Sequence, residues 1–401
     1  MYYCEDIPSW YIYMFNCNLL HMKILYVCPT SEFYGDGKAL LNIMPHLVSF
    51  GIEPVFIIPN DGEFTLKLKE YGYKYVVSHF GSWTTYKGKL SFRIVLAFIY
   101  NYLKELPKYK TLVKIVKDIK PDAIHTNCTT SLIGYRLSKE LGVPHVWHIR
   151  EYGLLDHKWN HFPSKTRFEK LYSKPLNYSI SITKDIFKYN GSPRNGIVIY
   201  DGVFDSNKIP IINDTDEGYF LYVGRIIKSK GIIELIETYK KYIENTKSPC
   251  RLKIAGEGFL IPHLREWIKL NYLEKYIELL GYRDDVSVLM SKARCLFVPS
   301  PNEAFGFITA EAMYNGCIVV GKNTAGTKMQ FDNCCSIIGY DVFYRYLTSS
   351  ELYNIMWEVT FSNKKEVMTD LLKAQNCVLS LYSVQSSAQS VYKYYKSFLS
   401  V

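Results

Sequence analysis

The sequence predicts an α/β protein made of two similar halves, each with a parallel β-sheet covered by helices. Short apolar strands alternate with amphipathic helices, which is typical of parallel sheets. The alternation stops at a polar stretch, residues 205–218, and then restarts. With 401 residues and 48% apolar residues, the chain is long and apolar enough for two cores. Two such halves imply a cleft, and open parallel sheets bind ligands beyond the carboxyl ends of their strands.

The first half has seven strand candidates separated by helical stretches. Two of the helices are expected at 38–50 and 131–141, and Gly142 and Pro144 stop the second one. The strands are expected at 23–29, 53–59, 74–79, 122–127, 144–149, 178–183 and 196–202.

The second half repeats this pattern after the polar stretch, which contains Pro210 and is expected to be a linker. A helix is expected at 232–242. Strands are expected at 219–225, 251–258, 276–282, 293–300 and 316–322. The predicted organisation is a first domain at 22–204, a linker at 205–218, a second domain at 219–379 and a C-terminal helix at 380–401.

The chain starts with an unusual segment, residues 1–21. It has no basic region and no small-residue cleavage site, so a secretory signal is not expected. Either Met22, which precedes a buried strand directly, is the natural start, or 1–21 form a loose extension. No run of 18 apolar residues occurs, so no membrane-spanning helix is expected. Ten cysteines without CxxC pairs indicate a reducing, cytoplasmic setting.

Positive charge is concentrated in one region. The net charge is +10, and ten Lys or Arg stand against Glu105 and Asp118 between Lys74 and Lys120. The aromatic, apolar segment 92–103 lies within this region, and such helices suit an anionic membrane surface. The alternative is a set of solvated helix faces. No nucleic-acid recognition motif is visible.

The stretch GRIIKSKG (224–231) directly follows a predicted strand and leads into a helix. Arg225 and Lys230 flank the turn between them. Two cations beside a helix N-terminus suit a diphosphate, because the cations and the free N–H groups both bind its oxygens. A basic solvated loop is the alternative.

The stretch PNEAFGFITAEAMYNG (301–316) places Glu303 on a strand-to-helix loop and Glu311 inside a helix that begins near 305–307 and ends at Gly316. Eight helical residues rise about 12 Å, which exceeds the roughly 5–9.5 Å between the two carboxylates of glycosidases. Acceptance of hydrogen bonds from sugar hydroxyls is a better role. The alternative is an acid that favours the helix dipole and a second solvated Glu.

Taken together, VGRIIKSKG, KIAGEG, ELLGY and FVPSPNEAFGFITAEAMYNGCIVVG resemble the retaining glycosyltransferases of family 4, also called the glycosyl transferases group 1. The resemblance covers nearly all of 219–322 and extends more weakly over 22–202. It implies the GT-B fold, in which two Rossmann-like domains face each other across a cleft and a C-terminal helix crosses back to the N-terminal domain. The first domain would bind the acceptor and the second the nucleotide sugar.

The resemblance also implies roles in the second half. Arg225 and Lys230 would hold the donor diphosphate and stabilise the departing nucleotide. Glu303 would lie near the donor sugar, and Glu311 would bind the ribose. The remaining donor-binding positions would be the backbone of Phe305, Gly306 and Phe307, and Tyr282 beside the nucleobase.

In the first half, the stretch 28–44 is similar to the family's glycine loop, so Gly35 and Gly37 would let backbone N–H groups meet the sugar or phosphate. A plain turn is the alternative. His148 matches the family's histidine near the reacting centre, whereas a lone histidine at a strand end is otherwise more often structural. Arg150 and Glu151 would support it or touch the acceptor.

The sequence departs from the family pattern at three places. In 323–330, Met329 or Gln330 stands where the family often has Glu; Asp201–Gly202 replaces Asn-Gly; and 331–350 lacks the expected glycine turns. The donor choice is the property that these departures affect most.

The expected function is therefore transfer of a hexosyl group from a nucleotide sugar to a glycan or lipid-linked acceptor, with retention. No Asp-x-Asp motif follows a strand, so no metal and no other cofactor are expected, and the cations and a helix dipole would balance the charge. Bacterial surface polysaccharide synthesis, at the inner face of the membrane, is the family's common setting. The alternatives are a non-catalytic binding or partner subunit and an oxidoreductase, which would need a GxGxxG that is missing after the first strand.

Overall fold

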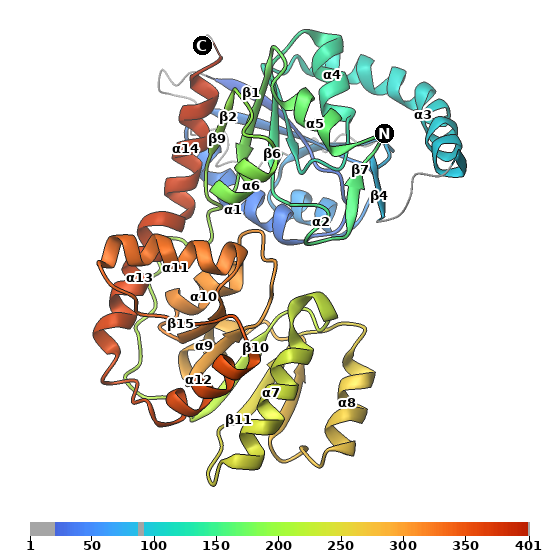
Figure 1. The fold of residues 1–401 in the computed structure, drawn as a ribbon. Coiled ribbons are helices and arrows are strands. Elements are labelled where there is room, and N and C mark those ends of the chain that lie inside the picture. The colour runs from blue at the N-terminus through green and yellow to red at the C-terminus, as the bar shows by residue number, and fades with distance from the viewer. Residues whose placement is uncertain (1–20, 87–91, 400–401) are drawn as a thin grey trace. The chain divides into compact units, whose positions relative to one another are not determined.

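The computed structural model shows two compact α/β units, each described here by itself (Figure 1). The first unit comprises Met1–Gly202 with Val384–Val401, and the second comprises Val203–Ser383. The structure describes residues 21–86 and 92–399. The leader expected at 1–21 lies outside the described residues apart from His21.

The first unit has a seven-stranded parallel sheet in the order β3-β2-β1-β5-β6-β8-β9. All seven predicted strands are confirmed. The order reverses between β1 and β5, and in such sheets this is the point at which the connecting loops diverge and leave room for a ligand. The strands are β1 (Met22–Val27), β2 (Ile52–Ile58), β3 (Lys74–Val77), β5 (Ala123–Asn127), β6 (His145–Ile149), β8 (Asn177–Ser181) and β9 (Gly196–Val198).

Helices cover both faces of this sheet. Apolar residues of α1, α2 and α14 pack in one cluster, and those of α3 and α4 in another. The C-terminal helix α14 therefore belongs to the first unit, as the fold prediction required. Among the described residues, no helix combines the length and the apolar character that crossing a membrane requires. The helices are α1 (Gly35–Ser49), α2 (Glu63–Glu70), α3 (Phe92–Ile119), α4 (Ile133–Leu141), α5 (Lys165–Tyr172), α6 (Lys184–Tyr189) and α14 (Val384–Lys396).

Two features of the first unit differ from the predictions. An antiparallel ribbon of β4 (Thr84–Tyr86) and β7 (Trp159–His161) was not expected, because three-residue strands carry no clear alternation. The helix predicted over 380–401 begins at Val384, since Ser383 is extended with φ −69° and ψ 146°.

The second unit has a six-stranded parallel sheet in the order β12-β11-β10-β13-β14-β15. Its order reverses between β10 and β13. The five predicted strands are confirmed, and β15 was missed because its three residues, YRY, form no apolar run. The strands are β10 (Tyr219–Val223), β11 (Arg251–Ala255), β12 (Ile277–Gly281), β13 (Cys295–Val298), β14 (Ile318–Lys322) and β15 (Tyr344–Tyr346).

Apolar residues of α7, α8, α12 and α13 pack against the strands in one large cluster. The predicted helix at 232–242 is confirmed and continues for another three residues. The elements are η2 (Lys228–Lys230), α7 (Ile232–Asn245), α8 (Ile261–Leu270), α9 (Val286–Lys292), α10 (Phe307–Tyr314), α11 (Ala325–Ile338), α12 (Ser349–Phe361) and α13 (Met368–Tyr382).

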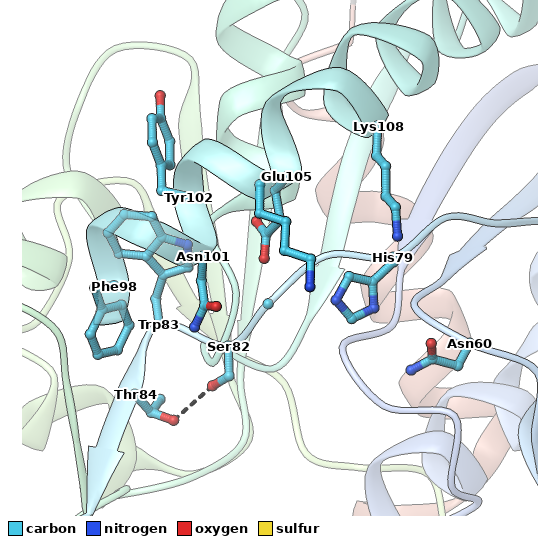
Figure 2. A pocket seen from close by; sticks show the side chains of 12 residues that line it. Asn60, His79, Ser82, Trp83, Thr84, Phe98, Asn101, Tyr102, Glu105 and Lys108 are labelled. Atoms are coloured by element: carbon cyan, nitrogen blue, oxygen red, sulfur yellow. Dashed lines mark hydrogen bonds between the residues drawn. The ribbon is translucent and has the colours of Figure 1, made fainter. Parts of the chain in front are cut away.

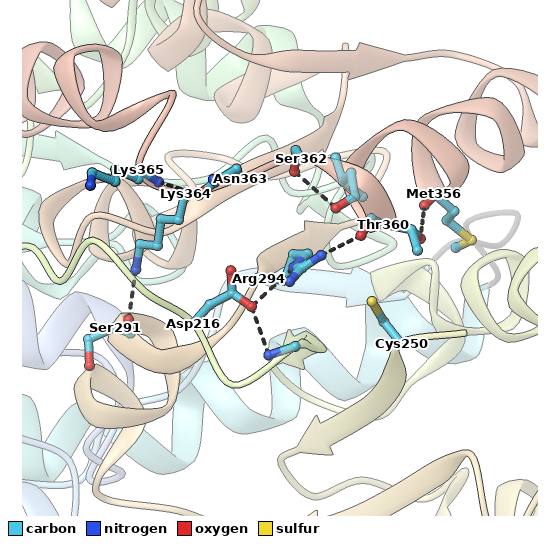
Figure 3. A network of polar contacts seen from close by, with 12 residues as sticks. Asp216, Cys250, Ser291, Arg294, Met356, Thr360, Ser362, Asn363, Lys364 and Lys365 are labelled. Atoms are coloured by element: carbon cyan, nitrogen blue, oxygen red, sulfur yellow. Dashed lines mark hydrogen bonds and ion pairs between the residues drawn. The ribbon is translucent and has the colours of Figure 1, made fainter. Parts of the chain in front are cut away.

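The polar stretch 205–218 is anchored to the second unit by Asp216 (Figure 3). Its carboxylate accepts hydrogen bonds from Arg294 Nε at 3.0 Å and from the Gly218 amide at 2.7 Å. Arg294 also donates to the Thr360 carbonyl oxygen. The end of this stretch is thus joined to both β13 and α12, which fixes where β10 begins.

Candidate active site

The predicted diphosphate residues lie at the point where the strand order of the second unit reverses. Arg225 follows β10, Lys230 ends the next turn, and Glu303 follows β13, the strand beside β10. Loops diverge at such a point and leave a place where a ligand can lie against backbone N–H groups. The sheet order thus explains why residues 73 positions apart in sequence meet.

Lys230 and Glu303 form a direct ion pair. Lys230 Nζ lies 2.6 Å from Glu303 Oε1, with side chains 24% and 14% exposed. Gly231, with φ +74°, makes this possible, because a Cβ there would lie 2.1 Å from the Pro299 carbonyl oxygen. Arg225 is exposed, and its guanidinium has no hydrogen-bond or ion-pair partner within 21–86 and 92–399. One cation is therefore paired and the other free to meet an anion.

Glycines with positive φ stand at both ends of α10, and the one that ends the helix was predicted. Gly306 is left-handed, with φ +87°, and is the N-cap of α10. Gly316, with φ +64°, follows the helix end. The first-turn amides of a helix have no intrahelical acceptor, so those of α10 can bind an anion. Phe305 is buried beneath the loop before α10, and Phe307 starts the helix and is half-buried.

Gln330 holds this loop in place, and the sequence pattern did not predict that role. Its Nε2 donates to the carbonyl oxygens of Phe305, at 2.7 Å, and of Gly306, at 2.9 Å. The Gly326 amide donates to the Glu303 carbonyl oxygen at 2.8 Å. A Glu at 330 could not make both bonds, because an ionised carboxylate only accepts. The departure from the family pattern in 323–330 is thus a structural part of the loop.

The other predicted donor-binding positions of the second unit lie along the same edge of the sheet. Glu311 is half-buried on α10, about one turn beyond its start. Tyr282 directly follows β12 and is 75% exposed. Three glycines with positive φ lie at the ends of the adjacent strands: Gly224 and Gly256 follow β10 and β11, and Gly281 is the last residue of β12. A Cβ at Gly256 would lie 2.0 Å from the Gly224 carbonyl oxygen, so this edge is shaped by close backbone contacts. The roles of Glu311 and Tyr282 remain predictions.

In the first unit, Gly35 and Gly37 lie in the first turn of α1 and not in a free loop. Neither has positive φ, and a Cβ at Gly37 would make only ordinary contacts with Phe64 and Phe33, at 3.4 and 3.5 Å. Their N–H groups are those of a helix N-terminus, which is itself suited to an anion. The predicted contact with sugar or phosphate stays a prediction.

His148 lies at the carboxyl end of β6 in a buried polar chain. Its Nδ1 lies 3.1 Å from His125 Nε2 and 3.3 Å from Arg150 Nη2. His125 Nδ1 lies 2.7 Å from the hydroxyl of Tyr395 on α14, which is 3.2 Å from the Tyr26 hydroxyl. His148 Nε2 is buried and has no hydrogen-bond partner among the described residues.

These contacts fix the tautomer of His148. Burial, Arg150 and His125 lower its pKa well below the usual value, so the ring is neutral and carries one proton. A guanidinium only donates, so Nδ1 accepts from Arg150 and the proton lies on Nε2. The histidine therefore presents a single N–H donor at the atom that lacks a partner.

Arg150 joins this chain to the residues around it. It forms a buried ion pair with Asp201 and donates through Nε to Asn127 Oδ1 at 2.8 Å. The Asp in the predicted Asp201–Gly202 departure is thus the counter-ion of Arg150. Glu151 accepts from the amide and hydroxyl of Thr129, at 2.7 and 2.6 Å, and burial raises its pKa to about 7.

Arg150 therefore does support His148, which was one of the two roles expected for it. Sequence reasoning did not assign a role to four residues that hold the candidate site in place: His125, Asp201, Gln330 and Tyr395. His125 could have been found, because it lies in β5, next to the strand reversal. Tyr395 could not, since its contact with His125 spans 270 positions and no local pattern identifies it.

Comparisons with known proteins agree with this architecture. Residues 204–333 match the family described as glycosyl transferases group 1. An uncharacterized glycosyltransferase of Methanocaldococcus jannaschii is 29% identical over 54% of this chain, and the match spans 60% of that relative's own length. The UDP-Gal:alpha-D-GlcNAc-diphosphoundecaprenol alpha-1,3-galactosyltransferase of Escherichia coli is 28% identical over 64% of this chain and 74% of its own.

Solved structures share the fold. Anabaena HepE in complex with UDP-glucose superposes with a TM-score of 0.72 at 19% identity, covering 94% of this chain and all of that one. At this identity the likeness shows the fold alone. Residues 204–333 are thus similar to the glycosyl transferases group 1, within a chain that has the GT-B fold.

Proposed function

We propose that this protein transfers a hexosyl group from a nucleoside diphosphate sugar to a glycan or lipid-linked acceptor, with retention, in the synthesis of a bacterial surface polysaccharide. The observation that carries the proposal is the Lys230–Glu303 pair beside the free Arg225. The relatives support the substrate class. The Escherichia coli enzyme is named for UDP-Gal and an undecaprenol diphosphate acceptor, and HepE was solved with UDP-glucose.

The chemistry follows from charge. As the bond between the sugar carbon and the phosphate oxygen breaks, negative charge grows on the diphosphate. Arg225, Lys230 and the first-turn amides of α10 stabilise that charge, and each such donor typically contributes about 3 kcal/mol. Lys230 then binds both the phosphate and Glu303, which limits its motion. No metal ion is required in this scheme, and excess EDTA is expected to leave transfer unchanged.

The acceptor oxygen bonds to the same face of the sugar carbon, and its proton passes to the departing phosphate oxygen. His148 is not the base in this proposal. Its Nε2–H donates to a sugar hydroxyl and holds the ring, because Nδ1 is already occupied by Arg150 and His125. The buried donor without a partner would cost about 1–3 kcal/mol, and substrate would satisfy it.

Release of UDP from UDP-galactose, UDP-glucose and UDP-N-acetylglucosamine tests the function directly. We expect slow hydrolysis of one donor without acceptor and faster release with a lipid-linked glycan. Saturable donor binding with no release under any condition would instead support the non-catalytic alternative. No binding of any nucleotide sugar would contradict the proposal.

We further propose that the protein acts at the inner, cytoplasmic face of an anionic membrane, through α3. Phe92, Leu96, Ile99 and Leu103 are exposed and recur on one face of the helix. The same face continues as three exposed lysines, 110, 114 and 117. An apolar stripe followed by a cationic one fits lipid tails beside anionic headgroups. This outer stripe therefore favours a lipid surface.

Flotation with vesicles containing phosphatidylglycerol tests the outer stripe. Leu96→Ser with Leu103→Ser should reduce vesicle binding about tenfold or more, because two apolar side chains no longer enter the lipid. The matched control is Ile209→Ser with Ile211→Ser, two exposed residues of the second unit. Equal loss in both variants, or no binding by the wild type, would contradict the proposal.

A further inference from the structure

A cavity of about 500 Å³ lies in the first unit, between the N-terminal half of α3 and the loop that follows β3 (Figure 2). All of its lining belongs to this one unit. Asn60 borders it from the loop after β2, and His79 and Ser82 from the loop after β3. It therefore lies on the carboxyl side of the sheet, where open parallel sheets bind ligands.

The α3 wall follows from helix geometry. Asn101, Lys104, Glu105 and Lys108 are spaced i, i+3, i+4 and i+7, so they share one face, and all four line the cavity. In Figure 2, Asn101, Glu105 and Lys108 reach from α3 toward the opposing loop. Leu103 lies two residues, about 200°, from Asn101, so the outer stripe is on the other side of α3.

The opposing loop is held firmly. The Trp83 amide donates to the Thr130 carbonyl oxygen at 2.6 Å, and the Phe162 amide donates to the Trp83 carbonyl oxygen at 2.8 Å. The Trp83 ring lies 5.9 Å from that of Phe98 on α3. Ser82 and Thr84 hydroxyls are 2.7 Å apart. The cavity therefore has two fixed walls.

The lining combines two kinds of group. Trp83, Phe98 and Tyr102 supply aromatic rings, and Asn60 and Asn101 supply amides, a combination that suits the apolar face and the hydroxyls of a sugar. Glu105 adds an acceptor beside Gly81; burial raises its pKa, with smaller opposing effects from His79 and Arg136.

Lys104 and Lys108 are one turn apart and exposed, and neither has an ion-pair partner among the residues that the structure describes. Paired free ammonium groups beside a sugar-type wall suit a phosphate.

We propose that this cavity binds the phosphorylated sugar of the acceptor, with the ring against Trp83 and Asn101 and the phosphate against Lys104 and Lys108. This rests on the proposed function, which supplies the lipid-linked acceptor. It names the part of the acceptor that the first unit recognises, a glycosyl phosphate. The two faces of α3 would then bind the two parts of one acceptor, its lipid surroundings on the outer stripe and its headgroup in the cavity.

Calorimetric titration of the full chain at low salt tests the proposal with N-acetylglucosamine 1-phosphate, N-acetylglucosamine and inorganic phosphate. The sugar phosphate should bind more tightly than either part. Lys104→Gln with Lys108→Gln should weaken the sugar phosphate about tenfold or more, through lost charge-assisted bonds. Asn101→Ala should weaken both the sugar and the sugar phosphate.

The control is Lys139→Gln with Lys174→Gln, two exposed lysines of the same unit, which removes the same charge and should bind as the wild type does. Equal affinity in the two double variants, or no saturable binding of the sugar phosphate, overturns the proposal. Two further results would overturn it. Inorganic phosphate that binds as tightly as the sugar phosphate would indicate a site for bare phosphate. Displacement of the bound sugar phosphate by phosphatidylglycerol vesicles would indicate a site for lipid headgroups.

UDP titration separates this proposal from the donor assignment. Lys104→Gln with Lys108→Gln should leave UDP binding unchanged, because the donor residues belong to the second unit. Binding of the sugar phosphate without UDP would overturn the donor assignment, whereas binding of UDP without the sugar phosphate would overturn that of the cavity.

Discussion

The two units use the same sheet architecture and treat charge in opposite ways. At the strand reversal of the second unit, Lys230 and Glu303 form a partly exposed ion pair, and Arg225 is exposed. In the first unit, the polar groups at the strand ends are buried, and burial lowers the pKa of four histidines: His125, His145, His148 and His161.

This difference suits the two units to two separate tasks in the proposed transfer reaction. Cations that water or a ligand can reach can stabilise a phosphate as its charge grows. Buried neutral rings in a hydrogen-bonded chain hold fixed donors and acceptors, because neither their protonation nor their orientation changes readily. The second unit is thus suited to charge, and the first to orientation.

The largest expected effect comes from removing a cation of the second unit. Lys230→Ala should lower transfer about 10²–10³-fold, since a donor to the developing charge is lost. Arg225→Ala should act similarly. The control is Lys228→Ala, an exposed lysine of the same turn, which should retain activity. Initial rates of UDP release measure this, with circular dichroism to confirm the fold. Similar rates for the variants at 228 and 230 would contradict the assignment.

The next largest effect is expected from a substitution of Gln330, which holds the loop before α10. Gln330→Glu should destabilise the second unit by about 2–3 kcal/mol and weaken UDP binding, because a buried carboxylate would face two carbonyl oxygens. Ile337→Glu, at an exposed position of the same helix, adds the same charge and should do neither. Thermal unfolding and UDP titration measure both effects. Tighter UDP binding by Gln330→Glu would show that the loop does not depend on this amide.

Acid should destabilise the first unit selectively. The pKa of His145 falls from 6.5 to about 3 on burial, so its contribution to stability is complete above pH 6.5 and is lost as the pH falls toward 3. At pH 5 such a histidine has lowered the free energy of unfolding by about 2 kcal/mol relative to neutral pH. Glu151 acts with the opposite sign and a similar size, because its raised pKa favours the folded state at lower pH and loses that effect as the pH rises through about 7. The net effect of acid is destabilising because the pKa values of His125, His148 and His161 are also lowered by burial.

Amide hydrogen exchange at pH 7 and pH 5 measures the stability of each unit separately. The first should lose more protection than the second, whose one histidine, His263, is exposed. His145→Gln should reduce the loss, whereas His157→Gln, on the surface, should not. Equal acid sensitivity of both units would contradict the comparison.

The smallest expected effect concerns α14. Tyr395→Phe removes the hydroxyl near His125 and Tyr26 and should cost about 1 kcal/mol of unfolding free energy in the first unit, as one buried hydrogen bond does. Tyr392→Phe, on the same helix, is the control. Urea unfolding compares them, and a loss no larger than that of the control would remove Tyr395 from the chain of contacts.

Much of the fold could be predicted from sequence, because apolar runs and periodicity are local properties. The twelve predicted strands and the helix start after Gly306 are confirmed for this reason. The three-residue strands β4, β7 and β15 carried too little pattern to be seen.

Only part of the candidate site could be predicted from the sequence. Residues that follow strands, such as Lys230 and Glu303, could be placed at one sheet edge from the alternation alone. Their direct pairing, and the contacts of Gln330 and Tyr395, depend on tertiary packing that spacing does not encode. Sequence reasoning treated Gln330 as a missing Glu, whereas its amide protons are what the loop requires.

The central claim is that Arg225 and Lys230 bind the diphosphate of the donor. Titration of UDP and of uridine into the wild type and Lys230→Ala tests it directly, because the two ligands differ only in the diphosphate. The account predicts that the wild type binds UDP much more tightly than uridine and that Lys230→Ala loses about tenfold or more of this preference. An unchanged preference in Lys230→Ala would contradict it.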